Sequence, residues 1–287
     1  MNFESWKAKG AFYEVGRHRI FVIEEGENKP YLCILHGYPS CSYDYHRVLP
    51  ALAAHFHVVV HDQPGFGLSG KPEDYSYSLI EQADAALLLW KELGIEEAYL
   101  LGHDYGTSVA TEIIARRNYG WEPVRIKAAL LGNGSILIGM ANLRLIQLLL
   151  RNRYLGPLVA RLSNRTIFNR NMKRLWADPG LVDSEELEVL WQMLNHHNGR
   201  RVLPNITRYL FEREKFWHRW VGGLYRTSLP IKILWAEEDP VAVVEMAYEL
   251  HEHIAGSELK LLPDIGHYPM LEAPEKWANA VIEMLKE

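Results

Sequence analysis

Five consecutive residues, Gly102-His103-Asp104-Tyr105-Gly106, constrain the fold of this 287-residue chain more than any other segment. A short apolar run at 98–101 precedes them, and a helical pattern from 107 to 117 follows. The two glycines allow a strand to turn sharply into a helix, so that the middle residue is held above the end of the strand. The N-terminus of that helix offers backbone N–H groups and a partial positive charge to a developing anion. The pattern therefore predicts a nucleophile at Asp104.

The identity of this nucleophile narrows the chemistry. A carboxylate is ionised at neutral pH without help, and it can displace a leaving group from a saturated carbon to give an ester that water later cleaves. A serine, in contrast, needs a base to activate its hydroxyl. Asp104 therefore favours epoxides or alkyl halides over esters and amides as substrates. A chance match to so short a motif is the alternative, and three further motifs argue against it.

Each of these further motifs follows a predicted strand. They are His36-Gly37-Tyr38-Pro39 after strand 31–35, Trp235-Ala236-Glu237-Glu238-Asp239-Pro240 after strand 231–234, and Gly266-His267-Tyr268-Pro269 after strand 259–262. The chain order Asp104, Asp239, His267 is the order nucleophile, acid, general base. We expect His267 to act as the base and Asp239 to orient it.

Together the four motifs resemble the Asp-nucleophile group of the α/β-hydrolase superfamily, which contains epoxide hydrolases and haloalkane dehalogenases. The resemblance implies the α/β-hydrolase fold, with a mostly parallel central sheet flanked by helices and a helical lid inserted over the site. It also implies an oxyanion hole formed by the backbone N–H groups of Tyr38 and Tyr105, and chemistry that uses no cofactor and no metal ion.

The orienting acid has competitors in its own motif, because Glu237 and Glu238 directly precede Asp239. Relatives that place the acid after the sixth strand would need a carboxylate near Asn133, and the sequence has none there. This absence favours Asp239.

Epoxide opening also needs a proton donor, because an alkoxide is a poor leaving group at neutral pH. The resembling family uses two lid tyrosines for this purpose. The range 133–227 contains only Tyr154, Tyr209 and Tyr225. The position of Tyr209 upstream of the return to the core matches the second donor of the family, and Tyr154 is then the expected first donor. Either could instead be an ordinary packing residue with a wet hydroxyl.

The pattern along the chain also predicts its organisation. Alternating strands and helices indicate a mostly parallel sheet covered on both faces. A hairpin is expected at 12–24, helices at 79–93 and 107–117, and strands at 31–35, 58–61, 98–101, 126–131, 231–235 and 258–262. Between 133 and 227 the strand signal disappears and helical periodicity prevails. We therefore predict two core segments, 1–133 and 229–287, and a helical lid at 134–228.

The predicted lid has an unusual charge distribution. Eight basic residues and no acidic residue occur between 141 and 177. Such a run could attract an anionic membrane surface or an anionic substrate, or it could simply form a solvated outer face. The lid is also rich in aromatic residues, which either suit an apolar substrate or pack the lid helices.

The composition of the chain limits the partners and the cellular location that we expect for it. The net charge of −5 and the pI near 6.2 argue against nucleic acid as a partner. No secretory signal is evident, and the apolar stretch 143–150 is interrupted by Arg144 and Gln147, so no transmembrane segment is expected. Cys33 and Cys41 are expected to be free thiols in a reducing, cytoplasmic compartment. A homodimer stays possible.

The sequence thus predicts an epoxide hydrolase that converts a small apolar epoxide and water into a vicinal diol through an ester on Asp104. A haloalkane dehalogenase is the main alternative, although the Asn or Trp donors that hold a halide in that family are replaced by Tyr38 and Tyr105. The chain also resembles the vertebrate mesoderm-specific transcript proteins along nearly its whole length. A non-catalytic protein that retains the fold is therefore a further alternative.

Overall fold

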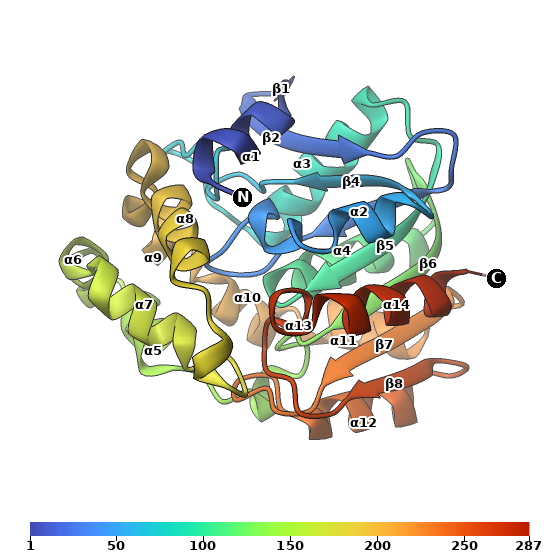
Figure 1. The fold of residues 1–287 in the computed structure, drawn as a ribbon. Helices are drawn as coiled ribbons and strands as arrows, with labels where there is room; N and C mark the ends of the chain where they lie inside the picture. Colours follow the sequence, from blue (N-terminus) through green and yellow to red (C-terminus); the bar gives the residue numbers. More distant parts are fainter. Residues whose placement is uncertain (287) are drawn as a thin grey trace.

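The computed structural model describes residues 1–286, which are built around one eight-stranded sheet (Figure 1). The strand order is β1-β2-β4-β3-β5-β6-β7-β8; β1 and β2 run antiparallel to their neighbours, and the other strands are parallel. The strands are β1 Ala11–Val15, β2 His18–Glu25, β3 Tyr31–Leu35, β4 His57–His61, β5 Glu97–His103, β6 Arg125–Gly132, β7 Ile231–Ala236 and β8 Glu258–Leu262. The predicted α/β-hydrolase architecture of the core is therefore confirmed.

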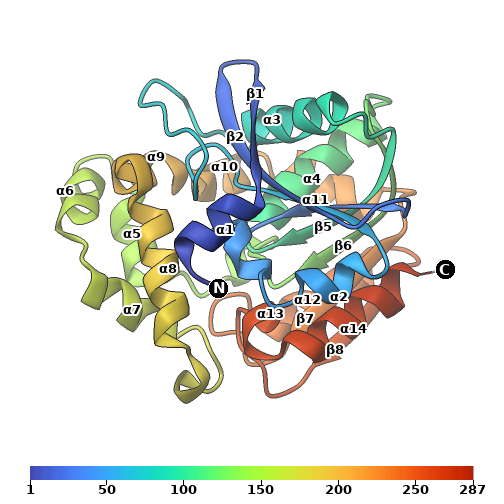
Figure 2. The ribbon, with the colours of Figure 1, turned by 45° about the horizontal axis from the view of Figure 1, so that its top comes forward.

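Helices cover both faces of this sheet. Helices α2 and α14 lie on one face, and α3 and α4 lie on the other (Figures 1 and 2). The helices outside the β6–β7 connection are α1 Phe3–Lys9, α2 Leu49–Ala53, α3 Leu79–Glu92, α4 Tyr105–Asn118, α12 Val244–His253, α13 Pro269–Glu272 and α14 Pro274–Leu285. The central strand β5 is buried along nearly its whole length, as expected for a parallel strand covered on both faces.

The connection between β6 and β7 contains helices and no strand. Its α-helices are α5 Leu145–Leu150, α6 Leu155–Leu162, α7 Arg165–Lys173, α8 Ser184–Asn195, α9 Leu203–Ile206, α10 Tyr209–Lys215 and α11 Trp217–Tyr225. In Figure 2, α5 to α9 stand to one side of the sheet. Helix α11 instead packs on α4, where the Trp220 indole donates a hydrogen bond of 2.7 Å to buried Glu112. The lid limits of 134 and 228 stay a prediction, and α11, which lies within them, packs on the core helix α4.

This topology brings the carboxyl ends of the parallel strands to one edge of the sheet, beneath the inserted helices. That edge is where open α/β sheets place their ligands. Both cysteines are buried and unbridged. Within residues 1–286, no helix combines the length and apolar character needed to cross a bilayer.

Candidate active site

Asp104 occupies the turn between β5 and α4. Its backbone has φ 48°, a conformation that costs energy for a residue with a side chain. The turn depends on a glycine two residues later, because a Cβ on Gly106 would lie 2.0 Å from the carbonyl oxygen of Leu35. The strand–turn–helix geometry expected of a nucleophile position is therefore present, and Asp104 is buried within it.

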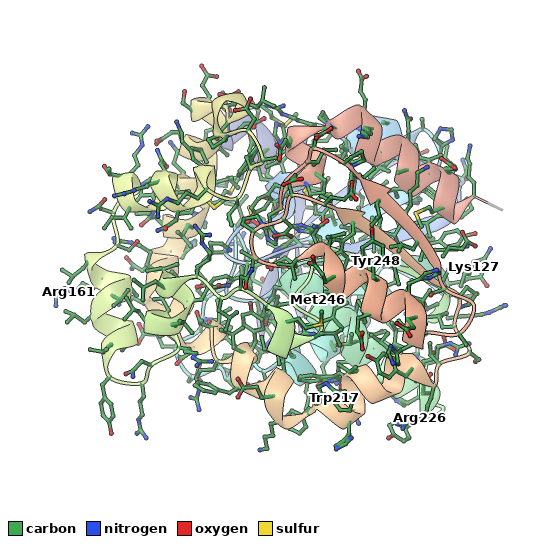
Figure 3. The ribbon with its side chains drawn as sticks, turned by 90° about the horizontal axis from the view of Figure 1, so that it is seen from below. Lys127, Arg161, Trp217, Arg226, Met246 and Tyr248 are labelled. Carbon is green, nitrogen blue, oxygen red and sulfur yellow. The ribbon has the colours of Figure 1, made fainter. Side chains whose placement is uncertain are left out.

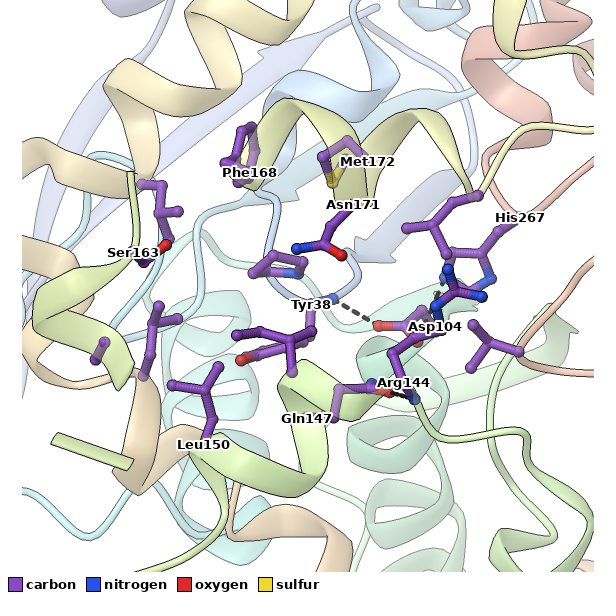
Figure 4. A pocket seen from close by; sticks show the side chains of 17 residues that line it. Tyr38, Asp104, Arg144, Gln147, Leu150, Ser163, Phe168, Asn171, Met172 and His267 are labelled. Atoms are coloured by element: carbon purple, nitrogen blue, oxygen red, sulfur yellow. Dashed lines mark hydrogen bonds and ion pairs between the residues drawn. The ribbon is translucent and has the colours of Figure 1, made fainter. Parts of the chain in front are cut away.

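Three side chains from different strand ends meet at this turn. His267, beyond β8, has its Nδ1 2.7 Å from Oδ2 of Asp239, which follows β7. The Nε2 of the same imidazole lies 3.5 Å from Oδ2 of Asp104 (Figure 4). Residues separated by as much as 163 positions in the chain thus form one contiguous constellation of carboxylate, imidazole and carboxylate.

Backbone groups fix the Asp239 carboxylate opposite the imidazole. Its Oδ1 accepts hydrogen bonds from the N–H groups of Val241 at 2.8 Å and Ala242 at 3.0 Å. The competing carboxylates Glu237 and Glu238 are partly or fully exposed, and neither pairs with His267 in the described structure. Of the three candidate acids, the structure therefore places Asp239 at the imidazole.

The charges of this constellation are strongly coupled. Burial disfavours the imidazolium of His267, but Asp239 and Asp104 outweigh it and raise the pKa of His267 to about 10. Burial likewise opposes ionisation of Asp104, yet the hydrogen bond and charge of His267 hold the pKa of this carboxyl below its usual value. At neutral pH the free site therefore contains an anionic Asp104 beside a cationic His267.

The predicted oxyanion-hole residues also adjoin Asp104. The backbone N–H of Tyr38 donates a hydrogen bond of 2.6 Å to Oδ1 of Asp104 (Figure 4). Tyr105 begins α4, directly after the nucleophile position. The two oxygens of the Asp104 carboxylate thus have different environments: Oδ1 is held by Tyr38, and Oδ2 faces His267.

A cavity of about 90 Å³ opens above Asp104 and His267. Figure 4 shows that the inserted helices form much of its wall. Its lining is mainly apolar, with contributions from Ile146, Leu150, Ala160, Phe168, Met172, Leu175, Leu194, Leu203 and Val241. Besides Asp104, His267 and Tyr38, four polar side chains line it, namely Arg144, Gln147, Ser163 and Asn171. Because ligand pockets usually measure about 300–1,000 Å³, a large substrate would require the inserted helices to move.

The sequence profile of the alpha/beta hydrolase fold family matches residues 30–274, a range that includes Asp104, Asp239 and His267. The chain belongs to this family. Two curated relatives match over most of both chains. LipZ of Mycobacterium tuberculosis, whose name places it among hydrolases, is 35% identical over 98% of this chain and 96% of its own length. The mesoderm-specific transcript protein of Mus musculus is 33% identical over 96% of this chain and 85% of its own length.

The likeness extends to solved structures. A haloalkane dehalogenase loop variant from Bradyrhizobium elkanii has a TM-score of 0.80 to this α/β hydrolase. The alignment covers 96% of this chain and 95% of the dehalogenase, with 22% sequence identity. At this identity the match supports the fold of the hydrolase and leaves its substrate undetermined.

The structure contradicts one expectation about the proton donors of this hydrolase. Tyr154 precedes α6, is 82% exposed and does not line the cavity. Tyr209, at the start of α10, does not line the cavity either, but it is buried, with its ring 4.9 Å from that of Tyr105 and 6.1 Å from that of the cavity residue Tyr38. The expected pair of lid tyrosines is therefore not formed, because Tyr154 faces solvent; only Tyr209 packs beside the nucleophile turn.

From the sequence, Asn133 was notable only because no carboxylate lies near it. In the structure its Nδ2 donates a hydrogen bond of 2.9 Å to Oδ2 of Asp239, and its backbone has φ 45°. The side-chain amide of Asn133 therefore holds the carboxylate of Asp239, the acid that follows β7, in position. The sequence could have indicated that Asn133 lies at the site, because this residue directly follows the end of β6.

Two buried ionisable groups near the site carried no signal in the sequence. Arg213 on α10 donates to the hydroxyl of Ser108, one turn after the nucleophile, and burial lowers the pKa of Arg213 to about 10, which leaves it cationic at neutral pH. Asp44 accepts a hydrogen bond from Ser40, and burial raises the pKa of this carboxyl well above its usual value. Neither residue belongs to a motif, so only the fold reveals its proximity to the site.

Possible metal ligands occur elsewhere on the hydrolase. Glu249, Glu252 and His253 on α12 present ligand atoms within 4.8 Å of one another. These are mostly exposed side chains that do not line the cavity. Acidic surface groups of this kind are common, and the chemistry available to Asp104 and His267 does not depend on them.

Proposed function

We propose that this α/β hydrolase is an epoxide hydrolase that opens small apolar epoxides through an ester on Asp104. The observation that carries the proposal is the nucleophile turn itself, which holds a carboxylate and not a hydroxyl within 3.5 Å of the His267 imidazole. The apolar lining of the cavity above Asp104 supports the same substrate class.

In the first step, one oxygen of Asp104 attacks an epoxide carbon and the carbon–oxygen bond of the ring breaks. The lowered pKa of Asp104 keeps this nucleophile ionised at neutral pH. The departing alkoxide takes the phenolic proton of Tyr209. Tyr38 lines the cavity, and its ring lies 6.1 Å from that of Tyr209. Its phenol, which pairs with the hydroxyl of Thr207 at 2.9 Å, takes the place of the second donor that Tyr154 cannot supply.

In the second step, water cleaves the ester. Formation of the ester removes the negative charge of Asp104, which is one of the causes of the raised pKa of His267. The imidazolium therefore becomes more acidic and gives a proton to the Tyr209 phenolate that the first step left, after which the neutral imidazole can take a proton from water. The hydroxide attacks the ester carbonyl, and the N–H of Tyr38 stabilises the oxyanion. The ester bond to the substrate oxygen then breaks, that oxygen takes the proton of the carboxylic acid so formed, and the diol leaves with the Asp104 carboxylate and the His267 imidazolium restored.

A haloalkane dehalogenase is the second candidate, and one observation favours it. The side chains of Gln147 and Asn171 line the cavity, and amide N–H groups can hold a departing halide. The backbone N–H of Arg144 already donates to the amide oxygen of Gln147, which leaves the amide nitrogen free of that contact. A non-catalytic role is the third candidate, and the intact geometry of Asp104, Asp239 and His267 argues against it.

The test is a single turnover in ¹⁸O-labelled water, with styrene oxide, cyclohexene oxide and a bromoalkane as separate substrates. The proposal predicts diol formation from an epoxide and entry of the label into Asp104, since water attacks the ester carbonyl. Label found only in the diol would make Asp104 a general base and overturn the covalent route. Halide release from the bromoalkane without turnover of either epoxide would favour the dehalogenase.

A further inference from the structure

The inserted helices have a second, outward face that the proposed chemistry does not use. Eight large apolar side chains are exposed between residues 140 and 167, among them Tyr154 at 82%, Leu145 at 70% and Leu162 at 64%. We call this set the outer lid face; it comprises Met140, Leu145, Leu148, Tyr154, Leu155, Leu158, Leu162 and Ile167. Exposed apolar side chains that are this frequent within one segment mark an interaction surface more often than single exposed leucines do.

The same helices bury their other side. On α5, Leu150 is buried and lines the cavity, whereas Leu145 and Leu148 are exposed. On α6, Ala160 is buried against the cavity, whereas Leu158 and its neighbours at 155 and 162 are exposed. The exposed leucines therefore do not contribute to the packing of these helices on the core.

Positive charge accompanies this apolar face. The range 141–177 holds eight arginines and lysines and no acidic residue. Among residues 1–286, two of the eight form ion pairs, Arg151 with Glu214 and Arg165 with Glu188. Of the other six, Arg144 lines the cavity, and the remainder include Arg161, whose side chain lies at the outer edge of the inserted helices in Figure 3. Since the whole chain has a net charge of −5, the remainder of the chain is strongly acidic and the excess of positive charge belongs to this segment.

We propose that the outer lid face docks on an anionic phospholipid bilayer. Exposed leucines with interspersed arginines match the pattern of helices that lie in the plane of a membrane interface, with the apolar side chains inserted and the cations among the headgroups. Symmetric pairing of two copies through this face would bring two unneutralised basic surfaces together, which like-charge repulsion opposes. Docking requires no catalysis and is independent of the reaction at Asp104.

Docking also has a geometric consequence. The inner sides of α5, α6 and α7 line the cavity, so a bilayer on their outer sides lies one helix layer from Asp104. Apolar compounds partition into that bilayer.

Flotation of the full chain with vesicles tests the proposal. We expect the chain to float with vesicles of phosphatidylcholine and phosphatidylglycerol in equal amounts, and to float much less with phosphatidylcholine alone. High salt should release it, because the electrostatic attraction is screened. Substitution Arg153→Glu/Arg161→Glu should weaken binding by roughly tenfold or more, given about 1 kcal/mol per basic residue near the surface.

Two further variants separate docking from general surface effects. Leu155→Ser/Leu158→Ser/Leu162→Ser should abolish flotation with unchanged thermal unfolding. The matched control Leu88→Ser/Lys91→Glu changes an exposed leucine and an exposed lysine on α3 and should bind like the wild type. Wild type that fails to float, or that binds both vesicle types equally, overturns the proposal. So does a triple-serine variant that floats normally, or one whose only defect is conversion of a dimer to a monomer.

Discussion

At the scale of single residues, the charge states of Asp104 and His267 depend on each other. Asp239 and Asp104 together hold His267 cationic, and His267 in turn holds Asp104 anionic, in a buried setting that disfavours both charges. Asp239 carries a second negative charge on the far side of the imidazole. A chemical event that removes the charge of Asp104 therefore changes the proton affinity of His267, which links the two steps of the proposed reaction.

The substitution Asp104→Asn should expose this link. The asparagine keeps the size of the side chain and removes its charge, so we expect the pKa of His267 to fall from its value of about 10. The direction follows because an anion within 3.5 Å favours the imidazolium. Titration of the His267 ring by NMR in wild type and variant measures the shift. An unchanged or raised pKa would show that Asp239 alone sets the charge of the imidazole.

Asp239→Asn should affect the second step far more than the first. Asparagine cannot stabilise the imidazolium that forms during ester hydrolysis, so we expect turnover to slow by about 10²–10⁴-fold while the alkylation burst is retained. Rapid-quench measurement of burst and steady-state phases separates the two steps. Glu238→Gln serves as the control and should leave both phases unchanged. A turnover defect in that control would show that Asp239 had been wrongly chosen as the acid.

At the scale of helices and strands, buried parallel strands were the most predictable part of the chain. Strands β3 and β7 lie within one residue of their predicted limits, because each is a short, mainly apolar run bounded by turn residues. The constellation of Asp104, Asp239 and His267 was predictable for a related reason, since each residue follows the end of a predicted strand.

Positions set by helix packing were much less predictable. Tyr154 was expected in the cavity, but in the lid a tyrosine gives no signal of which helix face it occupies; the structure shows it exposed. Arg213 and Asp44 lie near the site through contacts across the fold that no local pattern encodes. Helix α1 was not predicted either, because a seven-residue helix with one buried residue, Trp6, has almost no apolar periodicity.

The different placement of the two lid tyrosines makes a matched pair of substitutions informative. Tyr209→Phe should slow epoxide opening by roughly a hundredfold, the usual scale for loss of a general acid. Tyr154→Phe should have no effect, because its exposed hydroxyl is remote from the cavity. Pre-steady-state alkylation rates with styrene oxide compare the two variants. Equal rates for wild type and Tyr209→Phe would reduce Tyr209 to a packing residue.

At the scale of the whole molecule, the core and the inserted helices meet at the base of the site. The backbone N–H of His267 donates a hydrogen bond of 2.7 Å to the carbonyl of Leu175, which follows α7. The imidazole of His103 on β5 donates to the carbonyl of His267 at 2.8 Å. The loop that carries the general base is thus tied both to the sheet and to the inserted helices that line the cavity.

The central claim is that Asp104 forms a covalent ester with the substrate before water enters the reaction. His267→Gln removes the base needed for the second step and keeps the side chain of Asp104. Because it also removes the cation that lowers the pKa of Asp104, the incubation is done above neutral pH, where the carboxylate stays ionised. After incubation of this variant with styrene oxide, intact-mass measurement should show an adduct equal to one epoxide, and peptide mapping should locate it on Asp104. Wild type should show no lasting adduct. Absence of an adduct in the variant, with diol still produced at the wild-type rate, would contradict the account.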